Sequence, residues 1–424
     1  MSKLALFGGT PVRTAPFPSW PVFDESEEHA LLDVLRSGRW WNFRMGEAAN
    51  PGASVCAEST VARFQAAFAQ AQGARFGVAC ASGTAALEVA LKALGVGPGD
   101  EVVVPPYTFV ATASAPMLIG AVPVFCDIQA DTWNLDPSRL EAAITPRTRA
   151  IVPVHFAGLA ADMDAILAIA GRHGIAVLED AAHGHGGAWS GRGLGTIGRA
   201  GIFSFQASKN LTAGEGGLIT TDDPAIAELC ESYIWCGRKV GRPWYEHHRL
   251  GWNYRMTEFQ GAILSAQLTR MQAQTDRRLA NGFYLTERLA AIPGIRPLAV
   301  PPFATRHTFH IYAWRFDADH FGLEREEFLA ALAAEGIPCS SGYASPLYRN
   351  PMFQDPSLSA DYAQYTELCP VAEQACSEAV WLEHRLLLGT RSDMDDIVRA
   401  VAKIYQCRDQ FKTISSKTSQ GVLR

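Results

Sequence analysis

The sequence has no long apolar runs. In its 424 residues, apolar stretches such as 85–94 and 166–170 are far shorter than the roughly 20 residues that a membrane-spanning helix needs. Residues 1–9 also lack an apolar region long enough for a secretory signal. The sequence therefore predicts a cytoplasmic protein that does not enter a membrane.

Clusters of positive charge are missing as well. The chain carries 37 Lys and Arg against 43 Asp and Glu, a net charge of −6, and its basic residues are scattered along the sequence. Nucleic acid is bound mainly through basic stripes or runs, so we expect no nucleic-acid partner.

Paired cysteines are the third absence. The nine cysteines include no Cys-x-x-Cys motif, and their number is odd. This pattern argues against a disulfide framework and against zinc, so we expect buried, reduced thiols and no metal. What the sequence does have, 48% hydrophobic and 19% charged residues, is typical of a globular protein large enough for two domains.

An apolar strand that ends in a loop of small residues is the most informative local pattern. Residues 203–208, Phe-Ser-Phe-Gln-Ala-Ser, lead to Lys209, and the loop continues to the glycines of 214–217. An amine held there becomes nucleophilic when burial or a nearby cation lowers its pKa, and glycines let a ligand approach closely. Lys209 is thus a candidate Schiff-base lysine, although most lysines are solvated surface charges.

A candidate phosphate site lies upstream. Ser82, Gly83 and Thr84 precede a helical pattern that stops at Gly95, so we expect them at a helix N-terminus. Free backbone N–H groups and the helix dipole favour a phosphate there, and the two hydroxyl groups add donors. A Ser-Gly-Thr helix cap without a ligand would show the same residues.

Two further strands end on residues suited to an aromatic cofactor. One apolar run ends at Asp180 and is followed by His183, and the strand 101–104 is followed by Tyr107 and Phe109. A carboxylate at the end of a parallel strand points into the ligand crevice and can keep a pyridine nitrogen protonated. An aromatic ring there can stack on the cofactor. Taken singly, Asp180 could equally be a helix cap, and the aromatic residues could equally pack in the core.

Taken together and in this order, the motifs resemble the DegT/DnrJ/EryC1/StrS aminotransferases. These enzymes use pyridoxal 5′-phosphate (PLP) and share the aspartate-aminotransferase fold, which is PLP-dependent transferase fold type I. The resemblance covers nearly the whole chain, including 146–155 and 250–260. It implies a mostly parallel α/β sheet with helices on both faces and a smaller α+β C-terminal domain. Dehydratases of the family carry histidine in place of the lysine, so Lys209 favours transamination.

The resemblance assigns roles residue by residue. Lys209 resembles the lysine that holds the cofactor and moves protons, Asp180 the partner of the pyridinium nitrogen with His183 beside it, and Phe109 the stacking aromatic. The implied phosphate ligands are Ser82, Gly83, Thr84 and Ser204, with Asn253 reaching the phosphate from a neighbouring subunit. In relatives this last role falls either on that position or on the one held by Arg255. A homodimer with active sites at the subunit interface is therefore implied.

The segments around 37–41 and 369–388 indicate a branch of the family. They resemble glutamine:scyllo-inosose aminotransferases and 3-amino-5-hydroxybenzoate synthases more than nucleotide-sugar aminotransferases. This implies transfer of an amino group from L-glutamine to a cyclitol or sugar ketone such as scyllo-inosose, with pyridoxamine phosphate as the second cofactor form. The candidate substrate residues are Trp40, Trp41, His384 and Arg385.

Three alternatives stay open at this point. The acceptor could be a nucleotide-diphospho-ketosugar, or the reaction could be that of a 3-amino-5-hydroxybenzoate synthase-like aminotransferase/dehydratase. A protein with this fold could also bind PLP and serve regulation. The last alternative has little need for an acid–base amine at Lys209.

Alternating strand and helix patterns predict the layout of the chain. The expected strands are 101–104, 123–127, 150–154, 176–179, 202–205 and 217–221, and the expected helices are 84–94, 109–119, 136–143 and 161–173. A long helix over 256–288 precedes a strand at 308–316, a buried strand around Trp381 and helices near 325–335 and 393–405. We assign 1–35 to an N-terminal arm, 36–275 to a large PLP-binding domain, 276–412 to a small C-terminal domain and 413–424 to a flexible tail.

Overall fold

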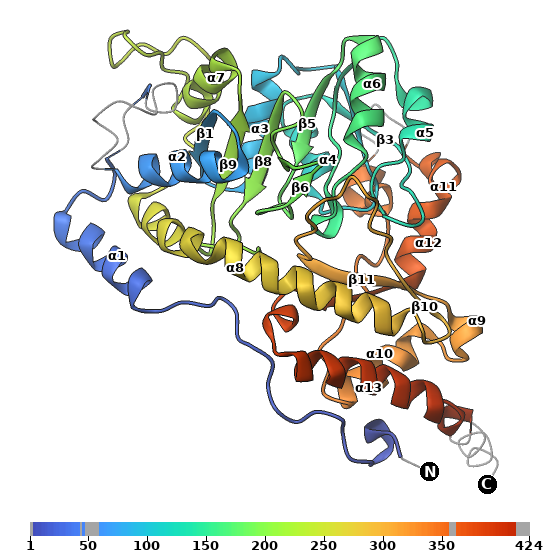
Figure 1. The fold of residues 1–424 in the computed structure, drawn as a ribbon. Helices are drawn as coiled ribbons and strands as arrows, with labels where there is room; N and C mark the ends of the chain where they lie inside the picture. Colours follow the sequence, from blue (N-terminus) through green and yellow to red (C-terminus); the bar gives the residue numbers. More distant parts are fainter. Residues whose placement is uncertain (1–2, 43–44, 47–58, 356–361, 413–424) are drawn as a thin grey trace.

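The largest element of the structure, a computed structural model that describes residues 3–42, 45–46, 59–355 and 362–412, is a seven-stranded sheet (Figure 1). Its strand order is β1-β9-β8-β5-β4-β2-β3. The pairings are parallel except those of β9, which runs antiparallel to β1 and β8. The strands are β1 (Phe76–Cys80), β2 (Glu101–Val104), β3 (Val122–Phe125), β4 (Thr148–Ile151), β5 (Ala176–Asp180), β8 (Ala200–Ser204) and β9 (Gly217–Thr221). The predicted mostly parallel α/β sheet is confirmed.

Helices cover this sheet. Strands β1, β2, β5, β8 and β9 are buried at every residue, as expected of a sheet with both faces covered. Helix α3 packs against α4 and α7 over the sheet, whereas α2 contacts β1 and α6 contacts β5. The helices of this region are α2 (Thr60–Gln72), α3 (Gly83–Ala93), α4 (Ala111–Leu118), α5 (Pro137–Leu140), α6 (Met163–His173) and α7 (Pro224–Ile234).

A 32-residue helix, α8 (Glu258–Leu289), runs between the large sheet and the rest of the molecule (Figure 1). It begins with a capping box in which Thr257 and Gln260 bond to each other's backbone N–H groups. Its buried residues recur mostly at intervals of three and four, which places them on one side of the helix. Helices α1 (Glu25–Ser37) and α2 pack against its first half.

The smaller unit lies on the other side of α8. It contains an antiparallel sheet in the order β10-β11-β12 and a separate apolar cluster that includes Leu4 and Phe17 of the N-terminal segment. Its elements are β10 (Ile295–Pro297), β11 (Ile311–Phe316), β12 (Ala379–Glu383), α9 (Ala318–Phe321), α10 (Arg325–Ala334) and α13 (Arg391–Cys407). Two short helices, α11 (Tyr365–Leu368) and α12 (Pro370–Glu378), pack with the core of the large sheet.

The predicted domain bounds do not coincide with the ends of elements. Helix α1 continues past residue 35, and α8 continues past residue 275. Apolar side chains between residues 347 and 379 pack with the large cluster, although the predicted bounds place them in the small domain. The residue bounds of the domains therefore stay a prediction, and the tail 413–424 lies outside the described residues.

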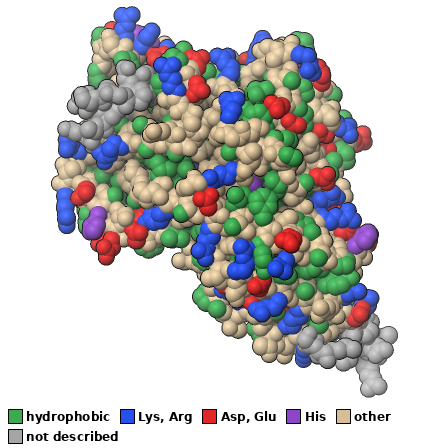
Figure 2. All heavy atoms as spheres, in the orientation of Figure 1, with side chains coloured by type: hydrophobic (Ala, Val, Ile, Leu, Met, Phe, Trp, Pro, Cys, Tyr) green, Lys and Arg blue, Asp and Glu red, His purple; other side chains and the backbone are tan. Residues whose placement is uncertain are grey.

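The distribution of surface charge and the burial of the cysteines agree with what the composition predicts. On the face shown in Figure 2, positive and negative side chains are interspersed. Of the eight cysteines in the described part of the chain, six are buried, and burial raises the pKa of the Cys80 thiol to about 12. Among the described helices, none combines the length and the apolar character that crossing a bilayer would require.

Candidate active site

Four motifs that are far apart in the sequence meet at one edge of the large sheet. Strands β1, β5 and β8 run parallel and end there, and the antiparallel β9 begins there, with Gly217 paired to both Cys80 and Ser204. A cavity of about 470 Å³ opens at this edge. Crevices beyond the carboxyl ends of parallel strands are the usual ligand sites of such sheets. The cavity lining includes Ser82, Gly83, Thr84, Phe109, Asp180, His183, Ser204 and Lys209, which are the predicted cofactor residues other than Asn253.

One end of the cavity is the N-terminus of α3. The Ser82 hydroxyl caps the helix by accepting the N–H of Ala85 at 3.1 Å. The first N–H groups of a helix have no acceptor inside it, so they are free to bind an anion. Only glycine fits at position 83, because a Cβ there would lie 2.7 Å from the Cβ of Ser204. This close approach sets the Ser204 hydroxyl beside the helix end, and the arrangement suits a phosphate.

Asp180 lies at the end of β5 and is buried. Its Oδ2 accepts a hydrogen bond from the Thr112 hydroxyl at 2.9 Å, and its Oδ1 accepts the N–H of Ala182 at 3.2 Å. Burial raises the pKa of this carboxyl above its ordinary value, although both hydrogen bonds and the charge of Lys209 act in the opposite direction. A cation in the cavity would offset the desolvation, so Asp180 suits a protonated ring nitrogen.

Phe109 and His183 form two walls of the same cavity. Phe109 follows β2, and its side chain is 57% exposed although it is large and apolar. Its ring is therefore free to stack on a planar ligand. Burial holds the pKa of His183 well below its usual range, so the imidazole is neutral, and its Nδ1 has no hydrogen-bond partner within the described residues. Buried polar atoms are usually paired, so this nitrogen is suited to a ligand.

Lys209 lies where this cavity meets a second one. Burial lowers the pKa of its ammonium group from 10.5 to about 8, against the opposing charge of Asp180. Each unit of pKa changes the ratio of amine to ammonium tenfold, so roughly three hundred times more free amine is present near neutral pH than for an ordinary lysine. The side chain thus has the property that a nucleophilic amine requires.

The second cavity, of about 590 Å³, shares Phe109, His183, Gln206, Ser208 and Lys209 with the first. Its outer walls carry aromatic rings and neutral imidazoles, namely Trp20, Tyr343, Trp381, His310 and His384. The predicted substrate residues His384 and Arg385 both line it. Arg385 is engaged within the chain, because its guanidinium contacts the carboxylate of Glu383 at 2.5 Å and the carbonyl of Pro18 at 3.3 Å.

The structure does not bring Trp40, Trp41 and Asn253 to these cavities of the same chain. Trp40 packs against Phe259 with ring centroids 5.8 Å apart. Trp41 packs against Trp235 at 5.5 Å, and Asn253 pairs with the backbone of Trp235 and is exposed. The Arg255 guanidinium lies 5.0 Å from the Trp41 ring. These side chains therefore form a surface group of their own, and their predicted roles stay predictions.

Several residues of the two cavities were missed in the sequence. Thr112 lies one helical turn after Phe109, and Gln206 belongs to the same loop as Lys209, so local spacing could have indicated both. Trp20, His310 and Tyr343 come from distant segments, and the residues next to them in the sequence form no pattern that indicates a binding site. They reach the cavity only through the packing of the N-terminal segment and the small sheet.

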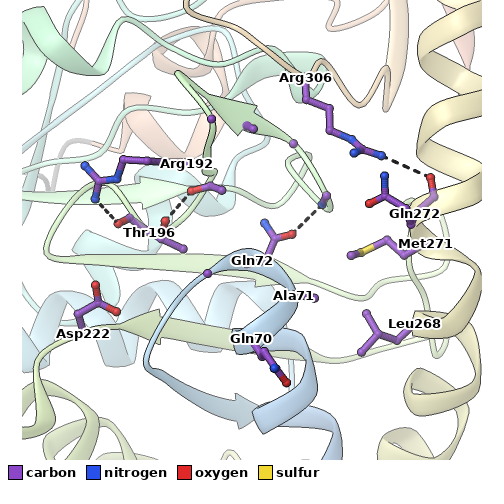
Figure 3. Close-up of a pocket in the computed structure, with 16 residues that line it drawn as sticks. Gln70, Ala71, Gln72, Arg192, Thr196, Asp222, Leu268, Met271, Gln272 and Arg306 are labelled. Carbon is purple, nitrogen blue, oxygen red and sulfur yellow. Dashed lines mark hydrogen bonds between the residues drawn. The ribbon is translucent and has the colours of Figure 1, made fainter.

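A larger hollow of about 710 Å³ lies elsewhere, between the end of α2, the β6 (Ala188–Trp189) and β7 (Arg192–Gly193) hairpin, and α8 (Figure 3). Several of its polar side chains bond to their own surroundings. Arg192 donates to the Thr196 carbonyl at 2.9 Å, and Gln72 accepts the Gly186 N–H at 2.9 Å. Among the described residues, its lining includes no lysine, histidine or cysteine. Size alone does not make it a reactive site.

Comparison with known proteins gives a consistent result. Residues 44–402 match the DegT/DnrJ/EryC1/StrS aminotransferase family. A protein of Streptoalloteichus tenebrarius, provisionally named an L-glutamine:3-amino-2,3-dideoxy-scyllo-inosose aminotransferase, is 42% identical over 97% of this chain and 100% of its own length. The L-glutamine:2-deoxy-scyllo-inosose aminotransferase of Micromonospora echinospora is 40% identical over 96% of this chain and 98% of its own. The crystal structure of a 3-amino-5-hydroxybenzoic acid synthase superposes with a TM-score of 0.84 at 34% identity, covering 93% of this chain and 100% of that one.

Proposed function

This chain belongs to the DegT/DnrJ/EryC1/StrS aminotransferase family, and from that premise we propose that it transfers the amino group of L-glutamine to the ketone of a cyclitol related to scyllo-inosose. The observation that carries the proposal is the pair of adjoining cavities with Lys209 between them. One is shaped for PLP, and the other has room for two small substrates in turn.

The residues of the first cavity fit PLP. The N-terminus of α3 and the Ser204 hydroxyl would hold the phosphate, Asp180 would pair with the ring nitrogen, and Phe109 would stack on the ring. Two observations support this fit: Nδ1 of His183 has no hydrogen-bond partner within the described residues, and the Asp180 carboxylate is desolvated, so a cationic ring nitrogen would stabilise its charge. Bound PLP carries the amino group between substrates and withdraws electrons from the carbon that loses a proton.

Lys209 would hold the cofactor through its Nζ and then act on the substrate. Released from that bond, the amine takes a proton from the carbon that carries the donor's amino group, and it returns a proton in the second half-reaction. Its lowered pKa of about 8 allows both roles, since the amine and the ammonium are both populated near neutral pH. Position supports the same roles, because Lys209 lines both cavities.

The second cavity favours an uncharged acceptor. Apart from Lys209, its charged lining residues are Glu383 and Arg385, and these two are paired with each other. A diphosphate would need cations or free N–H groups at its oxygens. A polyhydroxylated ring, in contrast, can use imidazoles and flat aromatic faces such as those of His310, Tyr343 and Trp381. The cavity therefore supports a cyclitol over a nucleotide-linked sugar.

We further propose a homodimer in which Asn253 reaches the phosphate of the neighbouring subunit. The exposure of Asn253 and of the nearby Trp41 ring, beside Arg255, supports this arrangement, because these side chains leave a partly apolar surface. Light scattering should give twice the mass of the chain. An Asn253→Ala variant should bind PLP more weakly, and unchanged PLP affinity would contradict the role of Asn253.

The decisive experiment follows the visible absorption of the PLP-loaded protein. L-Glutamine should remove the band of the lysine-bound cofactor, and 2-deoxy-scyllo-inosose or scyllo-inosose should restore it. A Lys209→Ala variant, which lacks the reactive amine, is the matched control. Recovery only with a nucleotide-linked ketosugar would overturn the choice of acceptor, and a band that no amino donor changes would refute the proposed activity.

A further inference from the structure

Two histidines of the small sheet hold the residues on either side of Lys209. Strands β11 and β12 pair Ile311 with Glu383, and the next position of this antiparallel register brings together His310 and His384. Their rings lie with centroids 5.6 Å apart and nearly parallel, at 23°. We propose that this cross-strand pair is a clamp that positions Lys209 between the two cavities. We also propose that Arg278 holds His384 in the tautomer that carries its proton on Nε2, which the clamp requires.

His384 holds the residue before Lys209. Its Nδ1 lies 3.1 Å from Nη2 of Arg278, and its Nε2 lies 3.0 Å from the carbonyl oxygen of Ser208. A guanidinium can only donate, so Nδ1 is the acceptor and Nε2 carries the proton that is donated to Ser208. Both nitrogens of His384 are therefore engaged by the protein. His384 acts on the substrate through Ser208 and Lys209, and it presents only its ring to the cavity.

His310 holds the residue after Lys209. Its Nδ1 lies 3.2 Å from Oδ1 of Asn210, whose Nδ2 donates to the carbonyl of Thr308 at 3.1 Å. This contact fixes the Asn210 amide so that its oxygen faces the imidazole, and Nδ1 of His310 is the donor. On its other face His310 lies 4.2 Å from the ring of His183, which borders the cofactor cavity. The clamp thus adjoins the cofactor cavity through His183.

Arg278 of α8 is the unusual member of this group. It is fully buried, its Nε and Nη1 have no partner within the described residues, and the ring of Trp20 lies 5.3 Å away. No described carboxylate pairs with this guanidinium, and burial lowers its pKa to about 9. Within the part of the chain that the structure describes, the side chain that hydrogen-bonds to Arg278 is His384. A buried cation costs stability unless it is paired, so retaining it there indicates a task, which we assign as fixing the tautomer of His384.

The same loop is tied down from the N-terminal segment as well. Trp20 donates from its Nε1 to the carbonyl of Ala207 at 2.9 Å, and its ring meets the edge of His384 at 4.5 Å. Residues 207, 208 and 210 therefore each bond to a side chain from outside the large sheet. The large sheet supplies Lys209, whereas the small sheet, α8 and the N-terminal segment determine where its loop lies.

The test uses the cofactor-free, full-length protein, so it does not require the substrate to be known. His384→Phe and His310→Phe keep a ring and remove the donor. We expect amide hydrogen exchange in residues 206–211 to rise about tenfold in each, because one anchoring hydrogen bond is lost. We also expect the pH midpoint for acetylation of Lys209, read by mass spectrometry, to move upward from about 8 as the amine becomes more solvated.

The matched control is His307→Phe. His307 is also buried and lies in the same segment as His310, but it accepts the N–H of Phe309 and stacks on that ring. This variant should leave the exchange of 206–211 and the acetylation midpoint unchanged. An Arg278→Met variant should give a smaller increase in exchange than His384→Phe, since the imidazole remains. His384→Gln retains an N–H donor, and it should restore part of the protection.

Folded His384→Phe and His310→Phe variants with wild-type exchange and a wild-type acetylation midpoint would overturn the clamp. If His384→Phe does not fold, His384→Gln and Arg278→Met decide the question by the same two measurements. The role of the clamp in catalysis rests on the proposed function, whereas its hold on Lys209 does not. An inactive wild-type protein with an intact clamp would therefore refute the activity and leave the clamp standing.

Discussion

The two adjoining cavities differ in how their charged groups are paired. In the cofactor cavity, the first N–H groups of α3 have no acceptor inside the helix, and the Asp180 carboxylate accepts hydrogen bonds but is desolvated by burial. In the second cavity, Arg385 is paired with Glu383, and both nitrogens of His384 are bonded. A site for one resident anionic cofactor can keep its donors free, whereas a site that receives two substrates in turn does better with charged groups that are already paired.

Removing the amine that the cavities share should have the largest effect. Lys209→Ala should lower amino transfer from L-glutamine by at least about ten thousandfold, because one side chain provides the covalent hold and both proton transfers. Turnover is the measurement, with circular dichroism to verify the fold. Residual activity within a hundredfold of the wild type would remove Lys209 from its proposed role.

The state of the same amine can be measured without turnover. In the cofactor-free protein, Lys209 should be acetylated with a midpoint near pH 8. The neutral amine is the reactive form, and it predominates at pH values above the pKa. The acetylation rate should therefore rise with pH through 8 and then level off. At pH 7 it should exceed that of a solvated lysine of pKa 10.5 by roughly two orders of magnitude. A midpoint near 10.5 would show that the cavity does not desolvate the amine.

A narrower test concerns the phosphate end. Gly83→Ala places a methyl group 2.7 Å from the Cβ of Ser204, so the start of α3 must shift. We expect PLP to bind about tenfold more weakly, with a smaller effect on the affinity of the substrates. Combining Gly83→Ala with Ser204→Gly removes the clash. Partial recovery of PLP affinity in the double variant would show that the contact between positions 83 and 204 causes the weaker binding. A wild-type dissociation constant for Gly83→Ala would contradict the tight approach.

The smallest effect is expected in the second cavity. Glu383→Gln leaves the Arg385 guanidinium without its carboxylate. The pair is largely exposed on the Glu383 side, so stability should change by less than about 1 kcal/mol. KM for an uncharged cyclitol ketone should change less than about threefold, whereas inhibition by a nucleoside diphosphate should become measurable. A large rise in KM for the ketone would mean that Glu383 contacts the substrate directly.

The cofactor cavity was the more predictable of the two. Its residues lie within a few positions of strand ends or helix starts, and such local patterns are visible in sequence. The strands 101–104 and 217–221 and the long helix were predicted within two residues, and the family prediction is confirmed. The buried strand around Trp381 is confirmed as β12.

The remainder depends on tertiary packing. Strand β1, with the sequence Phe-Gly-Val-Ala-Cys, was missed because its apolar run leads directly into the pattern of α3. The antiparallel direction of β9 cannot be read from its side chains, since a fully buried strand has the same composition in either direction. The pairing of His310 with His384 depends on the register of β11 against β12, which joins residues more than 70 positions apart.

Helix α8 has a consequence for how the protein unfolds. Its first half, with Leu264 and Met271, belongs to the apolar cluster of the large sheet, and its second half, with Leu285 and Leu289, belongs to the other cluster. A continuous helix of 32 residues spans about 48 Å, and unfolding it in the middle costs free energy because helix formation is cooperative. The two units therefore share one cooperative element, and calorimetry should record a single melting transition in which neither half outlasts the other.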